Sequence, residues 1–319
     1  MQTYKKERMI IEVLLIIVGL ALVLLGADWL VDGASAVARR SGISQFVIGL
    51  TIVGFGTSCP ELVVSVTGAI AGNGDIAIGN VMGSNIFNTL LILGLSAVIR
   101  PISVTGSNRK VDIPLLFFVT IAMICLGYNG LGRNDGLLFL VLFAAYMYFC
   151  FKMSPKEQSN EEEKEKKQLS TWAGLGLSVL GIAGLIFGGQ LFVNNAASVA
   201  KALNLSDKFI AITLLAGGTS LPELVTCVVA AVKGKQTLAL GNVIGSNVFN
   251  ILLILGCSAC VTDLPFKSLD IIDIAAFGLS PLLLLLSCWT FDKNKIKREE
   301  GLVFLLTFVA YYVWLFIKH

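Results

Sequence analysis

The sequence predicts an all-α polytopic membrane protein, with ten transmembrane helices arranged as two inverted five-helix repeats. The chain of 319 residues is 55% hydrophobic and only 14% charged. A soluble domain carries roughly 25% charged residues. Apolar stretches of about 20 residues, the length that crosses a bilayer as a helix, recur from end to end. Two polar motifs inside such stretches occur twice at one spacing, which predicts an internal repeat.

Ten apolar segments predict the transmembrane helices in order. The first segment is too long for a signal-peptide core and lacks a clear cleavage pattern, so we expect it to be retained. The first five helices are predicted at residues 9–38, 43–71, 75–99, 111–129 and 134–153. The second five are predicted at residues 171–200, 206–232, 236–262, 270–291 and 299–317.

A charged segment from Lys152 to Lys167 interrupts this pattern. Its mixed charge and lack of apolar residues are typical of a solvated linker. We therefore expect a first repeat at residues 1–151, a linker at 152–170 and a second repeat at 171–319. Because five is an odd number, the second repeat must enter the membrane in the opposite orientation. Inverted repeats characterise secondary transporters, which bind their substrate near the midplane where the repeats meet.

The two halves share motifs at a constant offset. Thr57-Ser58-Cys59-Pro60-Glu61 returns as Thr219-Ser220-Leu221-Pro222-Glu223, an offset of 223 − 61 = 162 residues. The same offset relates the segment 79–88, Gly-Asn-Val-Met-Gly-Ser-Asn-Ile-Phe-Asn, to the segment 241–250, Gly-Asn-Val-Ile-Gly-Ser-Asn-Val-Phe-Asn. Neighbouring apolar segments match without a gap, so we interpret the chain as a duplication.

The distribution of Lys and Arg among the loops predicts the orientation. Eight lie on the side that holds both termini, and sixteen lie on the opposite side, five of them in the linker. We therefore expect both termini outside, the linker in the cytoplasm and the protein in the cell membrane. The basic cluster at residues 5–8 argues in the other direction.

Each repeated motif carries a glutamate inside an apolar segment, and a carboxylate at membrane depth indicates a functional site. Pro60 cannot donate to the carbonyl of Gly56, so the helix should kink or unwind there and expose carbonyl groups to a cavity. Thr57, Ser58 and Glu61 are three or four residues apart, which predicts that their oxygens share one helix face.

The remaining motif residues extend this set. On the next helix, Ser84 and Asn88 lie four residues apart and add a hydroxyl and an amide oxygen. The second half supplies the equivalent residues Thr219, Ser220, Glu223, Ser246 and Asn250. An all-oxygen set suits hard cations such as Ca²⁺ and Na⁺, whereas softer metals prefer Cys or His.

The two glutamates carry a charge of −2, which balances one Ca²⁺ or two monovalent ions. Left empty about 4 Å apart, they would repel each other by about 4 kcal/mol at an effective dielectric constant of about 20. A vacant site should therefore take up cations or protons before the protein rearranges, which is a physical basis for obligatory exchange.

The motifs Gly-Thr-Ser-x-Pro-Glu and Gly-Ser-Asn-x-x-Asn, each present twice, resemble the α-repeats of the sodium/calcium exchanger family in the calcium/cation antiporter superfamily. The resemblance covers nearly the whole chain in its ten-helix prokaryotic form. It implies electrogenic exchange of Na⁺ for Ca²⁺ by alternating access. It also implies two carbonyl ligands, at Gly54 and Ala216, and side-chain ligands at Thr57, Ser58, Glu61, Ser84, Asn88, Thr219, Ser220, Glu223 and Ser246.

Asn250 departs from the family pattern. Several members have an aspartate at this position, which the potassium-dependent branch ties to K⁺ coupling. An amide here argues against K⁺ co-transport and makes the two halves more alike.

Other functions remain to be weighed against Na⁺/Ca²⁺ exchange. The nearest alternative is H⁺/Ca²⁺ antiport through the same glutamates, and a cation channel is a further one. Nothing predicts an enzyme, because His319 is the only histidine and we recognise no catalytic Asp pair or Ser/Lys dyad within one span. We expect no cofactor besides the transported Ca²⁺ and Na⁺, no nucleic-acid partner and no obligate protein partner, with the lipid bilayer as surroundings.

Several further polar residues are predicted to be structural. Asn85 and Asn247 point about 100° away from the face that carries the candidate ligands. Asp28 and Asp32 correspond to Gln190 and Asn194 in the second half, so a polar contact near the helix end is expected for them. Asp112 is expected at the membrane surface, at the start of its span.

Overall fold

The computed structural model describes residues 2–153, 169–202, 217–266, 270–290 and 293–318, with the side chains described from residue 9 onward except those of residues 153 and 290. Within these ranges, eight helices are long and apolar enough to cross a membrane. A ninth span results if Gln45–Thr57 and Cys59–Ile70, which meet at an angle of 49°, are one broken helix. The predicted span at 206–232 lies partly outside the described residues, so the count of ten stays a prediction.

The described helices follow the predicted order of spans. In the first half they are α1 (Gln2–Ser41), α2 (Gln45–Ile48), the π-helix η1 (Gly49–Val53), α3 (Gly54–Thr57), α4 (Cys59–Ile70), α5 (Gly74–Ile86), the π-helix η2 (Phe87–Leu93), α6 (Gly94–Ile99), the π-helix η3 (Asn108–Asp112), α7 (Ile113–Gly127) and α8 (Arg133–Met153). In the second half they are α9 (Thr171–Ala202), α11 (Leu221–Val232), α12 (Gln236–Val248), the π-helix η6 (Phe249–Ile254), α13 (Leu255–Val261), α14 (Ile271–Thr290) and α15 (Arg298–Lys318).

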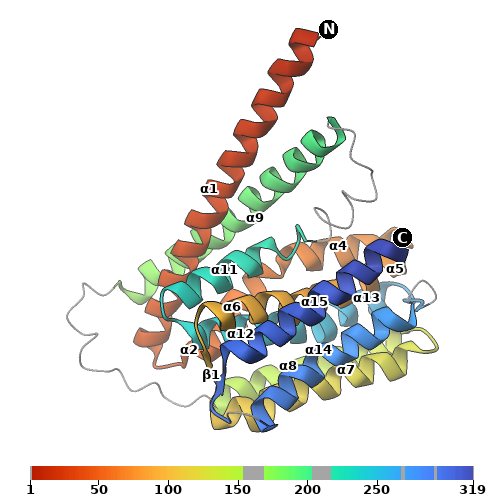
Figure 1. Cartoon of the computed structure of the whole chain (residues 1–319). Helices are drawn as coiled ribbons and strands as arrows, with labels where there is room; N and C mark the ends of the chain where they lie inside the picture. The colour runs from red at the N-terminus through yellow and green to blue at the C-terminus, as the bar shows by residue number, and fades with distance from the viewer. Residues whose placement is uncertain (1, 154–168, 203–216, 267–269, 291–292, 319) are drawn as a thin grey trace.

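The long helices α1 and α9 cross each other along one edge of the molecule (Figure 1). Glycines allow their backbones to approach closely. A Cβ atom added to Gly26 would lie 2.7 Å from the carbonyl oxygen of Gly181, and one added to Gly181 would lie 2.6 Å from the carbonyl oxygen of Gly26. Small residues at such crossings are typical of membrane helices, which associate through close packing rather than through the hydrophobic effect.

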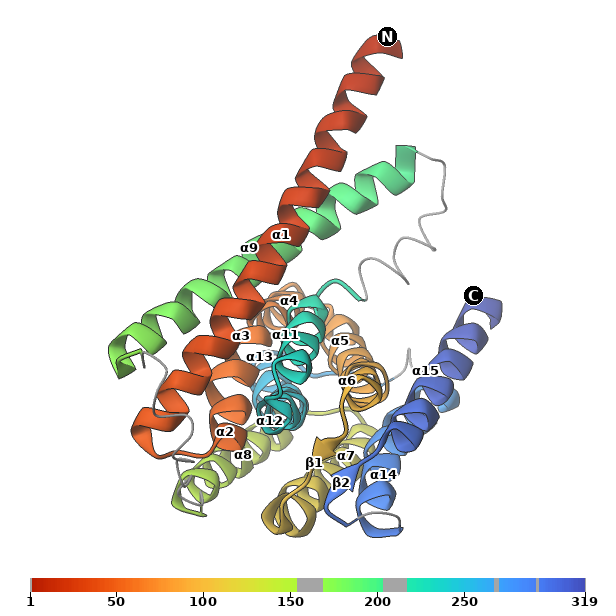
Figure 2. The same ribbon diagram turned by 60° about the vertical axis from the view of Figure 1, so that its left-hand side comes forward.

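The core consists of two continuous spans, Gly74–Ile99 and Gln236–Val261, which are the most buried of the eight. Figure 2 shows α12 and α13 near the centre, with α1 and α9 on one side and α14 and α15 on the other. Helix α12 contacts α2 and η1 through glycine, because a Cβ atom on Gly241 would lie 2.2 Å from the carbonyl oxygen of Phe46. This close packing holds the two motif-bearing regions together.

Short strands join the loops at the ends of the spans. Strand β1 (Ile102–Ser103) pairs antiparallel with β2 (Lys295–Ile296), with Ile102 opposite Ile296. A single bridge between Leu131 and Leu264 joins two other loops. Each connection links a loop of the first half to a loop of the second half.

Candidate cation-binding site

Both glutamate motifs lie where a helix begins again after a break. Ser58 precedes α4 with φ −85° and ψ 6°, and Ser220 precedes α11 with φ −87° and ψ 7°. A proline occupies the first turn of each helix, where its missing N–H group is not needed. The nearly identical backbones place Glu61 and Glu223 at equivalent positions in the first turns of α4 and α11.

The two glutamates are buried, each with only 1% of its surface exposed. Each accepts a hydrogen bond from the serine of the other half. Ser58 Oγ donates to Glu223 Oε1 at 3.0 Å, and Ser220 Oγ donates to Glu61 Oε1 at 3.3 Å. The site is therefore built across the interface between the halves.

Other predicted residues complete this cluster. Ser84 lies 3.3 Å from the Ser220 hydroxyl, and Ser246 Oγ lies 3.5 Å from both Glu223 Oε1 and the carbonyl oxygen of Gly54. Thr57 and Thr219 add their hydroxyls beside Glu223 and Glu61, respectively. Ala216 lies outside the described residues.

The carbonyl of Gly54 is not left free by the helix break. It accepts a hydrogen bond from the backbone N–H of Ser58 at 3.1 Å and lies 3.4 Å from the hydroxyl of Thr57. A carbonyl oxygen has two lone pairs. A cation could therefore bind this oxygen only in place of one of the hydroxyl contacts.

Asn88 and Asn250 lie one residue inside the π-helical segments η2 and η6. Wide π turns within α-helices frequently mark functional sites. Four buried oxygens here have no hydrogen-bond partner among the described residues: Glu61 Oε2, Glu223 Oε2, Asn88 Oδ1 and Asn250 Oδ1. Buried polar atoms without a partner are rare and require an explanation, such as an ion.

The predictions from sequence overlooked two asparagines that support the cluster. Asn80 Nδ2 donates to Ser65 Oγ at 2.9 Å and to the carbonyl of Glu61 at 3.2 Å. The equivalent Asn242 donates to Cys227 Sγ at 3.2 Å, and its Oδ1 lies 3.2 Å from the Thr57 hydroxyl. The available signal was that both belong to the repeated ten-residue motif.

A large cavity of about 620 Å³ adjoins the cluster. Thr219 and Pro222 line it on one side and Gly79 and Asn80 on another, while α9 contributes residues from Ile186 to Asn194. It extends from the glutamate motifs along α4 and α5 toward the loop that joins these two helices.

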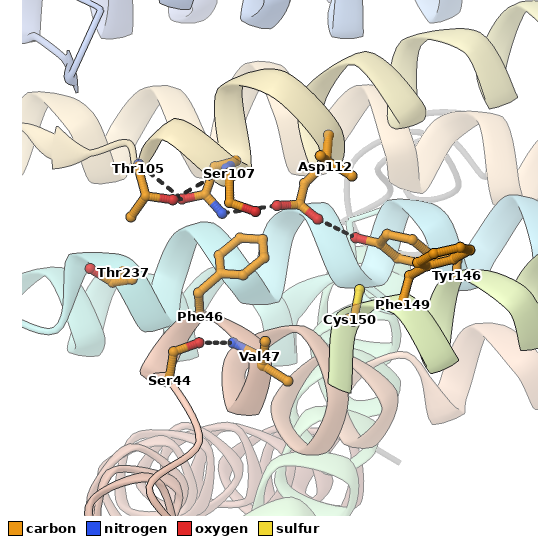
Figure 3. A pocket seen from close by; sticks show the side chains of 12 residues that line it. Ser44, Phe46, Val47, Thr105, Ser107, Asp112, Tyr146, Phe149, Cys150 and Thr237 are labelled. Carbon is orange, nitrogen blue, oxygen red and sulfur yellow. Dashed lines mark hydrogen bonds between the residues drawn. The ribbon is translucent and has the colours of Figure 1, made fainter. Parts of the chain in front are cut away.

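A second cavity, of about 70 Å³, shares no lining residue with this one (Figure 3). Asp112 faces it and accepts hydrogen bonds from Asn108 Nδ2 at 3.0 Å and from Tyr146 Oη at 3.1 Å. Asp112 lies near the start of its span, Asn108–Gly127, and is only 5% exposed. The packing of α8 against the start of its span covers it.

Asp28 and Asp32 form a polar contact near a helix end, as predicted. Lys233, which follows α11, lies 2.6 Å from Asp28 Oδ1 and 2.7 Å from Asp32 Oδ1. Partial burial lowers the pKa of Lys233, but its hydrogen bonds to both aspartates outweigh this and raise that pKa overall. The equivalent positions in the other half are Ala71, Gln190 and Asn194, so the ion pair has no counterpart there.

A family model described as sodium/calcium exchanger protein matches residues 11–152 and 173–317. The chain belongs to the sodium/calcium exchanger family. It is 33% identical to the sodium/calcium exchanger MaX1 of Methanosarcina acetivorans, over 96% of this chain and 99% of that one. It is 34% identical to the inner membrane protein YrbG of Escherichia coli, over 96% of each chain.

Solved structures of the sodium-calcium exchanger NCX_Mj have the same fold. One of them, soaked with Na⁺ and without Ca²⁺, superimposes with a TM-score of 0.84 at 36% identity, covering 95% of this chain and 98% of that one. This sodium/calcium exchanger family member is therefore a multi-pass membrane protein. It is a cation antiporter of the Ca²⁺-transporting class, not an enzyme.

Proposed function

We propose that this protein exchanges Na⁺ for Ca²⁺ by alternating access, with the ions bound between its two halves. Glu61 and Glu223 would supply the charge. The neutral oxygens would come from Thr57, Ser58, Ser84, Asn88, Gly54 and their equivalents Thr219, Ser220, Ser246, Asn250 and Ala216. No cofactor is needed besides the transported ions, and no protein partner is required.

The observation that carries this proposal is the set of four buried oxygens without partners. Two belong to carboxylates and two to amides, and neither glutamate has an ion pair in the described part of the chain. An uncompensated charge of −2 in a low-dielectric interior is strongly unfavourable. One Ca²⁺ or two Na⁺ would neutralise it and would engage all four oxygens.

The relatives favour Na⁺ over H⁺ as the counter-ion, since MaX1 and NCX_Mj are both named as sodium/calcium exchangers. The amides of Asn88 and Asn250 do not titrate and are good ligands for hard cations, so they would bind Ca²⁺ with either counter-ion.

The proposal includes the two inverted repeats, at 1–151 and 171–319, joined by the linker at 152–170. The pairs of contacts around the glutamates support it, because the 162-residue offset converts the Ser58–Glu223 contact into the Ser220–Glu61 contact. We assign both termini to the outside and the linker to the cytoplasm, as the distribution of Lys and Arg predicts.

In this orientation the large cavity would be the outer access path, because it extends toward the loop between α4 and α5. The opposite path is closed by the contact of Gly241 with Phe46 and by the ion pair of Lys233 with α1. The described conformation would thus be the one that exchanges ions with the outside.

Radiolabelled Ca²⁺ uptake into proteoliposomes tests the proposed exchange. Vesicles loaded with Na⁺ should take up Ca²⁺ when diluted into Na⁺-free buffer, whereas vesicles loaded with K⁺ should not. An imposed pH gradient without Na⁺ is the third condition. Uptake that follows only the pH gradient would contradict the proposal and would favour H⁺/Ca²⁺ antiport.

A further inference from the structure

Four asparagines form hydrogen bonds across the interface between the core helices. Asn250 Nδ2 donates to Asn85 Oδ1 at 2.9 Å, and Asn88 Nδ2 donates to Asn247 Oδ1 at 3.1 Å. All four side chains are buried, with 1–2% of their surface exposed. The offset of 162 residues converts one of these bonds into the other, as it does for the serine–glutamate contacts.

We propose that Asn85 and Asn247 are positioning residues, which fix the amide orientation of Asn250 and Asn88 and thereby set the cation affinity of the site. This inference rests on the proposed function, in which the amide oxygens of Asn88 and Asn250 bind the ions. Asn85 and Asn247 themselves do not touch the ions.

The physical reason is the near-symmetry of an amide group. Its oxygen and nitrogen have almost the same shape, but only the oxygen attracts a cation. The oxygens of Asn85 and Asn247 accept hydrogen bonds, so they require the NH₂ ends of Asn250 and Asn88 to face them. The oxygens of Asn88 and Asn250 then remain without a partner and free for a cation.

The amide groups of Asn85 and Asn247 are also held in one orientation by hydrogen bonds. Asn85 Nδ2 donates to the backbone carbonyl of Asn247 at 3.2 Å, and Asn247 Nδ2 donates to Thr89 Oγ1 at 2.7 Å. Their oxygens are therefore held toward Asn250 and Asn88. Each positioning residue belongs to the half opposite the ligand that it orients, so the two core spans must remain in contact for either amide to be fixed.

The test is a double-mutant cycle in the whole protein. Leucine has nearly the shape of asparagine but accepts no hydrogen bond, so N85L frees the Asn250 amide to turn its NH₂ group toward the ion. We expect the apparent KM for Ca²⁺ to rise about tenfold, the equivalent of one good hydrogen bond. The maximal rate should change less, because a bound ion still completes the cycle.

The second arm uses N250D, because a carboxylate presents an oxygen whichever way it turns. In this background N85L should change the KM for Ca²⁺ by less than about twofold. An equal rise in both backgrounds would overturn the proposal, because Asn85 would then act through packing. The pair N247L and N88D repeats the cycle in the other half and decides the question if N85L does not fold.

Binding provides a readout that does not depend on the counter-ion. The Ca²⁺ concentration that half-maximally raises the Tm of the purified protein should increase in N85L and in N247L in parallel with the KM. If the wild type binds Ca²⁺ but shows no Na⁺-driven uptake, the proposed exchange fails while the positioning role is still tested. An unchanged Ca²⁺ dependence of the Tm in folded N85L and N247L would overturn the positioning role alone.

Discussion

The charge balance of the site depends on two residues, Glu61 and Glu223. Both could be predicted from the sequence, because a duplicated carboxylate in an apolar segment has few structural explanations. Their hydrogen-bond partners could not. The sequence places Ser58 beside Glu61, but the structure bonds it to Glu223, because the fit of the two halves decides which serine reaches which glutamate.

Neutralising either glutamate should weaken Ca²⁺ binding strongly. In Glu61→Gln or Glu223→Gln the site keeps a charge of −1, so a bound Ca²⁺ leaves one positive charge uncompensated. We expect at least a 100-fold loss of Ca²⁺ affinity, about 3 kcal/mol, as for other broken buried charge pairs. The double variant should show no Ca²⁺ uptake.

Isothermal titration of the purified variants with Ca²⁺ measures this effect. Glu299→Gln is the matched control, because Glu299 is exposed in the first turn of α15, away from the site. Ca²⁺ uptake by the folded double variant would show that other groups carry the charge.

The contacts of Asn85 and Asn247 could be predicted only in part from the sequence. Their direction, away from the ligand face of their own helix, is predicted by helical geometry and is compatible with a structural role. The geometry of one helix does not show which residues of the opposite core span lie beside it. Each asparagine meets a proposed ligand from the other half, and only the packed pair of core helices reveals that contact.

At the scale of elements, the sequence predicts the helix break at Pro60 and most boundaries of the described spans to within a few residues. It does not predict the π-helical segments, because an apolar run accommodates one extra residue per turn without changing its composition. The segments that carry Asn88 and Asn250 became visible only from the backbone hydrogen bonds.

The crossing of α1 and α9 should be sensitive to a single methyl group. In Gly26→Ala the new Cβ would meet the backbone of Gly181 at 2.7 Å, and backbone atoms cannot move aside independently. We expect a destabilisation of about 1–3 kcal/mol, as in other overpacked interiors. Thermal unfolding of the detergent-solubilised protein should show a lower apparent Tm.

Gly176→Ala provides the control on α9, because a Cβ atom at Gly176 would have no neighbour within 4 Å among the described residues. Equal Tm values for the two alanine variants would contradict the close approach of α1 and α9.

The ion pair between Lys233 and α1 should slow the opening of the closed path. Its groups are partly exposed, with 27% of the Lys233 side chain and about half of each aspartate side chain accessible, so its contribution is about 1 kcal/mol. In Lys233→Met, the buried thiol of Cys227 should therefore react about fivefold faster with a small thiol reagent.

The experiment requires a background in which Cys227 is the only cysteine. Lys110→Met removes an exposed lysine as a control for charge. If both variants are labelled at the wild-type rate, the ion pair does not restrain α1.

At the scale of the whole molecule, the arrangement of the spans can be checked by labelling from outside the cell. In a cysteine-free background, Tyr128→Cys should react with an impermeant reagent, because Tyr128 is 86% exposed in the loop on the side assigned to the termini. Gly106→Cys, in the loop before α7, should react only after the membrane is opened. The reverse pattern would invert the assigned orientation.

The sequence predicts a duplication, since the motifs repeat at one offset without a gap. The close contacts between the halves could not be predicted. Glycines recur every seven residues on α1 (19, 26, 33) and on α9 (174, 181, 188), but such spacing marks a packing face without identifying the partner helix. Gly241 and Gly79 occupy equivalent positions, yet only Gly241 is closely packed, while Gly79 lines the large cavity. Equivalent residues in the two halves can therefore have different surroundings.

The exchange of serines between the halves has a consequence for the origin of the protein. Because Ser58 serves Glu223 and Ser220 serves Glu61, neither half contains a finished site. Two antiparallel copies of a single half would satisfy every one of these contacts, so a gene half as long could already encode a working site. Joined in one chain, the two halves can differ in sequence. The ion pair of Lys233, which has only Ala71 at its equivalent position, is a trait that an identical pair could not have evolved on one side alone.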